Sequence, residues 1–476
     1  MLPLESTIAQ KHKSTCAFVL KCSSAQVLMP YPRTKFTRPI RRAIMIFLIT
    51  LFCVLAPLII LYTAGYRYDY SAKKIKQTGV ISIDVEPKNV RVYLNDVLIQ
   101  KRIPIRLTNR APGAYHLRIE ADRRKTWEKD IMVESKQTTY IRDITLFQEA
   151  LPIEIEAYAG QEINNVFFSH DGAYSLILKQ KDNVYELSLF NTKTKITYPL
   201  TRTYDEYPPK VDWSYYSPVA MIETRENNIS KIQIFNARNP EASADIHTIE
   251  APEPINYQWS DDIAAPSVFA QEGNKILRLT MAGKSEIKNN IISNVWYIDN
   301  VNRLWIFDKK NQVLQIAGET SETRVYPVKN ELTKIIHLND KRLIAKSNQG
   351  VVILPLEKNN VNENKTIDAE RIRYNPDTNE WLAWSPWELW TIYPNGNVEL
   401  LNRTSDAIMS ITPMDKFGVL LLAAEKTLRG FNPGYYITHE LFSGGKINEA
   451  AADIENRQIY FWGEVGQRRG LFGLEY

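Results

Sequence analysis

The sequence predicts an all-β ectodomain behind one N-terminal transmembrane helix, made of a small β-sandwich and a β-propeller of about eight blades, with seven as the alternative. Three observations lead to this fold class. Residues 43–65 carry no charge, residues 78–148 alternate apolar and polar positions, and a short strand ending in an aromatic residue recurs through residues 151–476. A basic tail, 1–42, and a juxtamembrane linker, 66–77, complete the predicted organisation.

The net charge of +5 is unevenly distributed along the chain. Residues 1–42 hold eight Lys/Arg against one Glu, residues 66–150 hold 17 against 11 acidic residues, and residues 151–476 hold 34 against 42. Because sequence-independent nucleic-acid binding needs a basic surface, the acidic large domain argues against it. All three cysteines lie in the first 53 residues, so the sequence excludes a disulfide framework or a cysteine zinc site beyond that point.

The uncharged segment has the length of a membrane span. Its core, 43–64, has 22 residues, and as a helix it would cover about 33 Å, close to the thickness of a bilayer core. Pro57 should kink this helix without preventing insertion. Tyr62, Tyr66 and Tyr68 follow, as in an aromatic belt at the membrane surface, although these tyrosines could instead begin a soluble strand.

The flanking charges predict the orientation. Arg38, Arg41 and Arg42 precede the span, so the positive-inside rule places the N-terminus in the cytoplasm and residues 66–476 outside. We expect an uncleaved anchor in the cytoplasmic membrane, because the apolar segment is too long for a signal peptide and no Ala-x-Ala site follows it. The tail shows no helical or strand period, which predicts disorder, and Met29 is an alternative start to Met1.

The small domain is predicted to be a β-sandwich of five or six strands. Its alternating segments are 80–85, 90–94, 115–119, 127–133 and 139–146. The order Pro87, Val92-Tyr93-Leu94-Asn95, Ile103-Pro104-Ile105, Pro112-Gly113-Ala114-Tyr115, Trp127 and Ile144-Thr145-Leu146 resembles the PEGA domain, over residues 79–147. The sequence departs from the family where its signature reads Pro87-Lys88-Asn89-Val90 and where Asp96 replaces a usual glycine. The resemblance implies a module of bacterial or archaeal surface proteins, and no catalytic residue.

The large domain is predicted to be a propeller from its repeat. The aromatic-ended strand is marked by Phe168 and then by positions 213, 259, 297, 337, 374, 411 and 453, at intervals of 37 to 46 residues. Three more strand patterns, at 174–179, 184–190 and 196–200, follow the first mark, and four strands in about 40 residues are typical of a propeller blade. Residues 450–476 have room for three strands, so 153–158 is predicted to supply the fourth and close the ring.

The first repeat also carries a family resemblance. Phe168-Ser169-His170-Asp171-Gly172-Ala173 resembles the repeat of TolB-like propellers, and partial copies occur at Trp213-Ser214 and Trp259-Ser260-Asp261. We interpret Asp171 and Gly172 as residues that shape a tight turn. The resemblance implies the fold and leaves the activity open, because propellers serve many functions.

The candidate ligand-binding residues are four tryptophans within ten residues: Trp381, Trp384, Trp387 and Trp390. They could fill the core, or they could form an aromatic platform for sugar rings or a partner chain. A spacing of three places Trp381 and Trp384 on opposite faces of a strand.

No motif in the sequence argues for catalysis. The chain has no G-x-S-x-G elbow, no P-loop and no EF-hand run. We therefore expect no enzyme activity, no metal and no cofactor, and we predict a membrane-anchored surface protein that binds an envelope glycan or protein. The alternatives are a non-catalytic scaffold of an envelope assembly complex and a propeller hydrolase or lyase acting on polysaccharide. The sequence leaves the oligomeric state open.

Overall fold

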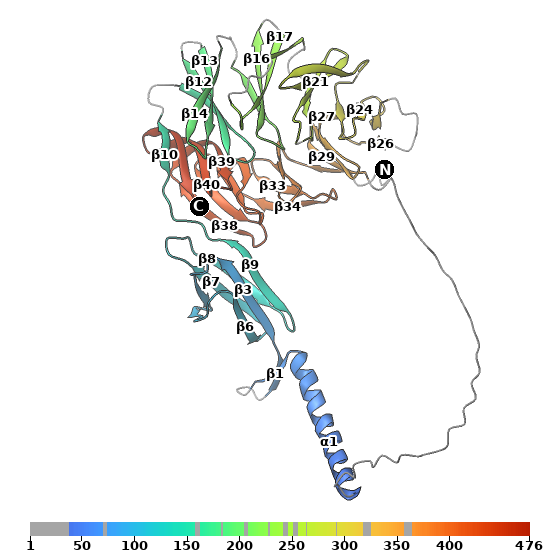
Figure 1. Ribbon diagram of the computed structural model, residues 1–476, viewed down its shortest axis with the longest axis vertical. Coiled ribbons are helices and arrows are strands. Elements are labelled where there is room, and N and C mark those ends of the chain that lie inside the picture. The colour runs from blue at the N-terminus through green and yellow to red at the C-terminus, as the bar shows by residue number, and fades with distance from the viewer. Residues whose placement is uncertain are drawn as a thin grey trace, which may run out of the picture. The chain divides into compact units, whose positions relative to one another are not determined.

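A computed structural model describes the chain over twelve segments (Figure 1). These are residues 38–69, 74–157, 162–181, 184–203, 208–226, 229–240, 246–250, 256–262, 264–291, 293–317, 325–356 and 364–476. The predicted disorder of the tail therefore falls outside the described residues, except for 38–42. The described chain divides into two units, up to Lys76 and from Gln77 onward.

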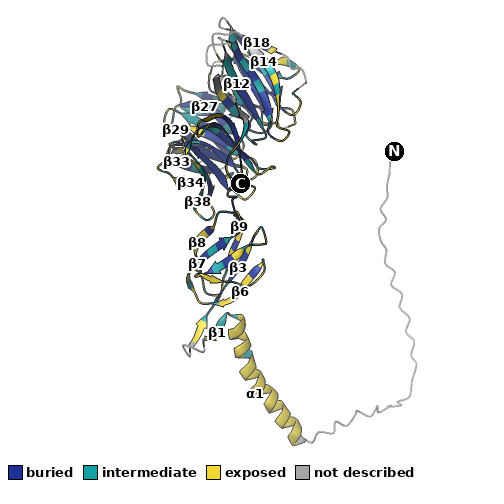
Figure 2. Cartoon of the chain, turned by 90° about the vertical axis from the view of Figure 1, so that its left-hand side faces the viewer, coloured by how far each residue is buried: buried dark blue, intermediate teal, exposed yellow. Residues whose placement is uncertain are grey.

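The first unit holds the helix α1 (Arg38–Thr63) and a two-stranded sheet of β1 (Tyr66–Asp69) and β2 (Lys74–Gln77). Among the described residues, α1 is the one helix long and apolar enough to cross a membrane, with a mean hydropathy of 3.1 over Pro39–Thr63. Figure 2 colours most of the helix as exposed, and its large apolar side chains, such as Phe47 and Phe52, are exposed.

The helix begins five residues before the predicted span of 43–65 and ends two residues before its end. The helix begins at Arg38, so Arg38, Arg41 and Arg42 lie in its first turns and not in an irregular tail; arginine has a high helix propensity, which favours this extension. Tyr62 lies in the last turn, whereas Tyr66 lies in β1.

Tyr68 lies in β1 as well, and the segment predicted as a linker therefore contains strands. The helix ends before Gly65, whose φ of 80° is the left-handed conformation that commonly follows a helix C-terminus.

The small domain is a sandwich of two sheets with strand orders β6-β3-β9 and β5-β4-β7-β8. The strands are β3 (Gly79–Glu86), β4 (Arg91–Leu94), β5 (Val97–Leu98), β6 (Ile105–Arg110), β7 (Gly113–Glu120), β8 (Trp127–Val133) and β9 (Thr138–Thr145). Alternate residues point inward, so that Ile81, Ile83, Leu117, Ile119 and Trp127 form one core with almost no exposure. β3 and β9 pair in parallel, and the other pairs are antiparallel.

The departure at Asp96 is accommodated by the backbone. Asn95 and Asp96 have φ values of 50° and 63° between β4 and β5. A two-residue turn with positive φ at both positions favours Asn, Asp and Gly, so Asp96 can occupy a position where glycine is usual.

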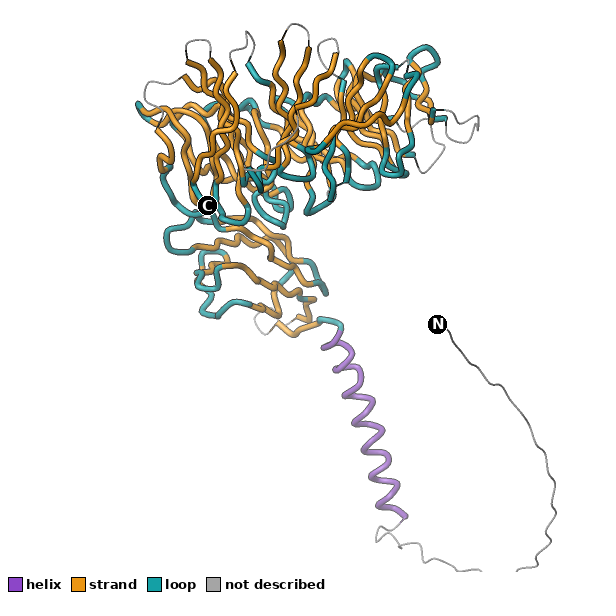
Figure 3. Tube along the Cα trace, turned by 45° about the horizontal axis from the view of Figure 1, so that its top comes forward, coloured by secondary structure: helices purple, strands orange, loops and turns teal. Residues whose placement is uncertain are grey.

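Within the described residues, the large domain consists of eight four-stranded antiparallel sheets, which we number as blades 1 to 8 (Figure 3). Blades 1 and 2 are β11 (Glu162–Phe168), β12 (Tyr174–Lys181), β13 (Val184–Asn191), β14 (Ile196–Thr203), and β15 (Lys210–Trp213), β16 (Val219–Glu226), β17 (Ile229–Asn236), β18 (Ile246–Glu250). Blades 3 and 4 are β19 (Tyr257–Trp259), β20 (Val268–Glu272), β21 (Lys275–Thr280), β22 (Gly283–Lys288), and β23 (Trp296–Ile298), β24 (Leu304–Asp308), β25 (Val313–Ile316), β26 (Tyr326–Pro327). Blades 5 and 6 are β27 (Leu332–Leu338), β28 (Arg342–Ser347), β29 (Gly350–Pro355), β30 (Lys365–Ile367), and β31 (Arg371–Asn375), β32 (Glu380–Trp384), β33 (Glu388–Ile392), β34 (Val398–Arg403). Blade 7 is β35 (Ile408–Pro413), β36 (Leu420–Ala424), β37 (Thr427–Asn432), β38 (Ile437–Ser443). Blade 8 is β39 (Gly445–Asp453), β40 (Gln458–Val465), β41 (Arg468–Glu475) with β10 (Ile153–Ala157).

The all-β fold class predicted from the repeat is confirmed, with eight blades. Every repeat mark falls in the first strand of its blade. First strands of neighbouring blades contact one another, as β11 does with β15 and β35 with β39, so they line the axis of the ring. The ends of these strands therefore meet near that axis.

The ring closes as the sequence predicts. β10 pairs antiparallel with β41, which joins Ile153 to Gly473 and Ala157 to Gly470. Blade 8 thus contains three C-terminal strands and one strand that precedes blade 1. Residues of blades 1 and 8 also share a core, where Phe168 packs with Ala451 and Trp462.

Gly172 allows the backbones of blades 1 and 8 to approach each other closely. Its φ is +67°, and a Cβ at this position would lie 2.2 Å from the carbonyl oxygen of Ala452. We expect Gly172→Ala to destabilise the protein by more than the about 1–2 kcal/mol that a left-handed residue alone costs. Gly273→Ala is the matched control, because Gly273 has a φ of +58° and nothing within 4 Å of its Cβ position. Equal losses for the two variants in thermal unfolding would contradict this role of the contact.

Candidate functional site

A pocket of about 490 Å³ lies at the end of the propeller axis where several first strands end. Blades 1, 2, 6, 7 and 8 contribute to it through the ends of their first strands or the turns that follow them. Two turns that follow third strands add the charged side chains Lys193 and Arg238. The remaining lining combines aromatic, amide and carboxylate groups: His170, Asp171, Tyr174, Asn191, Tyr215, Tyr216, Tyr374, Asn375, Asp377, Asp453, Glu455 and Asn456, with Ala173, Ser217, Pro218, Pro376, Pro413 and Ile454. We call this the axial pocket.

An aromatic cluster packs beneath the axial pocket. Tyr215 and Tyr216 follow β15 in blade 2, and they contact residues of blade 6 across the ring. The ring of Tyr215 lies 5.4 Å from Trp381, the ring of Tyr216 lies 5.1 Å from Tyr374, and His170 stacks on Tyr215 at 5.1 Å. Edge-to-face and stacked pairs at these distances are favourable. Burial raises the pKa of Tyr215, so its hydroxyl stays neutral.

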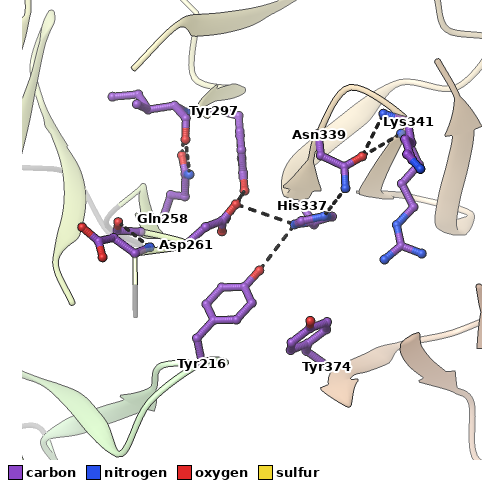
Figure 4. A network of polar contacts seen from close by, with 12 residues as sticks. Tyr216, Gln258, Asp261, Tyr297, His337, Asn339, Lys341 and Tyr374 are labelled. Carbon is purple, nitrogen blue, oxygen red and sulfur yellow. Dashed lines mark hydrogen bonds and ion pairs between the residues drawn. The ribbon is translucent and has the colours of Figure 1, made fainter. Parts of the chain in front are cut away.

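A polar network fixes Tyr216 from the side of blades 3, 4 and 5 (Figure 4). The Tyr297 hydroxyl donates to both oxygens of Asp261, at 3.1 and 3.0 Å, and the Tyr216 hydroxyl acts on the pKa of the same carboxylate. His337 Nδ1 lies 3.4 Å from the Tyr216 hydroxyl and 3.9 Å from Asp261 Oδ2. Burial raises the pKa of Asp261, while the hydroxyls of Tyr297 and Tyr216 act in the opposite direction.

The tautomer of His337 follows from its neighbour Asn339. Asn339 Oδ1 accepts from the backbone N–H groups of Lys341 and Arg342, at 3.0 and 2.9 Å, so its Nδ2 must face His337 Nε2, at 3.1 Å. Nε2 therefore accepts, and Nδ1 carries the proton toward Tyr216. Burial, with the nearby Arg342 charge, lowers the pKa of His337 to about 4, so the imidazole is neutral near pH 7. The network positions a tyrosine and supplies no free base.

A second buried cluster lies at the axis between blades 2, 3 and 5. Asp212 Oδ2 accepts from the Tyr257 hydroxyl at 3.0 Å and from Trp259 Nε1 at 2.8 Å. Lys334 Nζ lies 4.1 Å from the centre of the Tyr257 ring. Burial raises the pKa of Asp212 and lowers that of Lys334, and the attraction between the two groups opposes both shifts. The cluster lines a small cavity of about 50 Å³, together with Tyr215 and Tyr216.

Two carboxylates of the axial pocket stabilise turns. Asp171 Oδ1 accepts from Ser169 Oγ at 2.6 Å and from the Ala173 N–H at 3.1 Å, as expected of the repeat turn. Asp453 Oδ2 accepts from Asn456 Nδ2 at 2.7 Å and from Thr192 Oγ1 at 3.0 Å. The exposed groups at the rim of the pocket can contact a ligand, and they include Asp377, Lys193 and Arg238.

The four candidate tryptophans do not line the axial pocket. Trp381 and Trp384 are 0% and 5% exposed and pack on opposite faces of blade 6, with blades 5 and 7 respectively, as their spacing predicts. Trp390 is half-buried, and Trp387 is 54% exposed. Trp381 acts on the pocket indirectly, because its ring supports Tyr215 and Tyr374.

The sequence reasoning did not identify the tyrosines that shape the pocket. Tyr215 and Tyr216 follow Trp213-Ser214 at the positions that His170 and Asp171 occupy after Phe168-Ser169. The residues directly after each repeat mark were therefore an available signal. Among the residues that the structure describes, no group of three or more His, Cys, Asp or Glu side chains is arranged to hold a metal.

The sandwich and the eight-bladed ring define the class of protein as an all-β chain with a propeller, behind one helix that is long and apolar enough to cross a membrane. Residues 78–149 match the PEGA domain, so the chain carries a PEGA domain followed by a propeller, as the sequence resemblance indicates. A search of curated proteins found no match.

Solved structures similar to this chain share little sequence with it. The β-propeller domain of Cps50 (Swd1) from Myceliophteria thermophila is 8% identical, with a TM-score of 0.43, over 68% of this chain and 100% of that one. Virginiamycin B lyase from Staphylococcus aureus with quinupristin is 13% identical, with a TM-score of 0.36, over 69% and 100%. An uncharacterized protein from Listeria monocytogenes is 12% identical, with a TM-score of 0.38, over 62% and 98%.

Proposed function

We propose that this chain is a membrane-anchored, non-catalytic binding protein that holds its propeller outside the cytoplasmic membrane and binds an envelope glycan in the axial pocket. The observation that supports this best is the lining of the pocket. Tyr215, Tyr216 and Tyr374 provide aromatic surface, and amides, carboxylates and two cations surround them. Sugars are bound by this combination, because ring faces stack on aromatic side chains while hydroxyls exchange hydrogen bonds with polar groups.

The rest of the chain supports the same proposal. α1 is a suitable anchor, and the arginines in its first turns favour a cytoplasmic N-terminus. The PEGA domain is basic, and exposed side chains such as Lys101, Arg102 and Arg106 would attract anionic head groups or wall polymers near the membrane. The carboxylates Asp171 and Asp453 are engaged in turns, which supports binding without turnover.

The test is co-sedimentation of the full-length protein, in detergent micelles, with purified cell-wall polysaccharide across a salt series. We expect Tyr374→Ala and Asp377→Ala to weaken binding at least tenfold, which corresponds to about 1.4 kcal/mol. Trp387→Ala is the control, because Trp387 is 54% exposed and lies outside the pocket. Wild-type binding that resists salt would support a contact in the pocket, since binding through the basic PEGA surface should weaken with salt.

Two results would overturn the proposal. One is retention of wall binding by Tyr374→Ala together with its loss in Trp387→Ala, which would move the site to the tryptophan segment. The other is the absence of sedimentation with any wall material. That result would favour the scaffold function, which one observation supports: the PEGA domain and the propeller are joined by buried contacts at Phe147 and Tyr435.

A further inference from the structure

A second cleft lies between blades 6 and 7 and differs in chemistry from the axial pocket. It has a volume of about 410 Å³. Its lining includes two carboxylates, three aromatic rings and a threonine: Glu380, Glu399, Tyr393, Phe417, Tyr436 and Thr391. We call it the blade 6–7 groove.

The lining of the groove carries two carboxylates, of which Glu380 is attracted by the buried guanidinium of Arg342, whereas Glu399 has no such cation in the part of the chain that the structure describes. Its lining contains no Lys, Arg or His, and within the described residues no ion pair at 4.0 Å or less involves Glu380 or Glu399. Tyr393 donates to Glu399 Oε2 at 2.5 Å, and Tyr436 Oη lies 3.5 Å from Oε1. This carboxylate raises the pKa of Tyr393 to about 12, which keeps the phenol protonated as a donor.

A buried hydroxyl in the same groove has no partner. Thr391 is only 2% exposed, and its Oγ1 makes no hydrogen bond in the described structure. Thr378 Oγ1, which also lines the groove, is likewise buried and unpartnered. Because buried hydroxyls are normally satisfied, two unpartnered oxygens in one cleft indicate a place for a donor from outside the chain.

The rings add a preference for an organic cation. Phe417 and Tyr436 are 52% and 63% exposed at the mouth of the groove. Lys416 Nζ lies 5.2 Å from the centre of the Phe417 ring, so Tyr436 offers the accessible ring face. Aromatic faces attract ammonium and guanidinium groups, and carboxylates form charge-assisted hydrogen bonds with them. A small inorganic cation would gain little from the rings and would leave most of the cleft unfilled.

We propose that the blade 6–7 groove binds a basic side chain, arginine or lysine, from a polypeptide partner. The guanidinium or ammonium would pair with Glu399 and Glu380 and would donate to Thr391. The aliphatic part of the side chain would lie on Tyr436. This site is independent of the glycan proposal, because the two pockets share only Asn375.

The experiment is a saturation-transfer NMR titration of the full-length protein in detergent micelles with N-acetyl-arginine methylamide. N-acetyl-citrulline methylamide is the matched probe, since it has nearly the same shape without the charge. We expect the citrulline probe to bind at least tenfold more weakly, Glu399→Gln to weaken arginine binding at least tenfold, and Thr391→Val to weaken it severalfold. Glu425→Gln, at an exposed turn between β36 and β37 of blade 7, should have no effect.

Equal binding of the arginine and citrulline probes would overturn the proposal, and this result does not depend on any variant folding. Unchanged arginine binding in Glu399→Gln would also overturn it, as would the absence of saturation transfer to the arginine probe. The glycan proposal would be unaffected by these outcomes, because its test uses Tyr374 and Asp377.

Discussion

Replacing Phe147 with alanine should lower the free energy of unfolding by about 3–5 kcal/mol, the usual cost of truncating a buried phenylalanine. Phe147 directly follows the PEGA strands, yet it is 2% exposed within the core of blades 7 and 8. Its ring faces Gly430, where a Cβ would lie 2.3 Å from Phe147 Cζ, and it lies 5.5 Å from His439. The glycine leaves space for the ring, so alanine at 147 should leave a cavity.

The measurement is chemical unfolding of the full-length protein, followed by tryptophan fluorescence. Leu151→Ala is the matched control in the same connecting segment, because Leu151 is 83% exposed and its loss should change stability by no more than about 0.5 kcal/mol. If Phe147→Ala were as mild as Leu151→Ala, the PEGA domain and the propeller would not depend on this contact.

A second set of contacts joins the same two domains at Tyr435. This residue lies in the turn between β37 and β38, and its ring meets Trp127 edge-to-face at 5.3 Å. Its hydroxyl donates to the Arg142 carbonyl at 2.7 Å and accepts from the Arg142 N–H at 3.1 Å, while Thr145 Oγ1 donates to Asp415 at 2.6 Å. The connection between the domains is therefore packed and hydrogen-bonded.

Periodicity explains why the sequence predicted the fold well. An alternating strand must bury one face, and four such strands in each interval of about 40 residues leave few architectures other than a blade. The closing strand β10 was predictable for the same reason, because three strands in residues 450–476 left an exposed edge that needed a partner.

The candidate site was less predictable, because it depends on which residues meet at the axis. Trp381 and Tyr215 are far apart in the sequence, and no periodic pattern relates them, yet their rings are in contact. The tryptophan segment stood out by composition, although burial assigns Trp381 and Trp384 to the core. No local pattern related Tyr216 to His337, since their hydrogen bond joins blades 2 and 5.

Acid should destabilise the propeller through His170, and this effect should be about 1.4 kcal/mol per pH unit over the range where only the unfolded chain binds the proton. His170 is hydrogen-bonded to the backbone of Trp213, whereas its Nδ1 is buried without a partner. Burial, together with the charge of Arg373, lowers its pKa to about 3 from the ordinary 6.5. Between these two values the unfolded chain binds a proton that the folded chain does not, so stability present above pH 6.5 is lost as the pH falls toward 3.

The comparison of wild type with His170→Gln isolates this contribution. Burial raises the pKa of Asp212, Asp261 and Glu449, so these groups favour the folded state in acid and oppose the effect of His170 in the whole protein. Their contributions cancel when the two proteins are compared at each pH. We expect the stability difference to be constant above pH 7 and to shift in favour of the variant by several kcal/mol between pH 6.5 and pH 4. The free energies of unfolding of both proteins are measured in urea at each pH. If their difference did not change between pH 6.5 and pH 4, protonation of His170 would not destabilise the folded state, and its Nδ1 would be open to water.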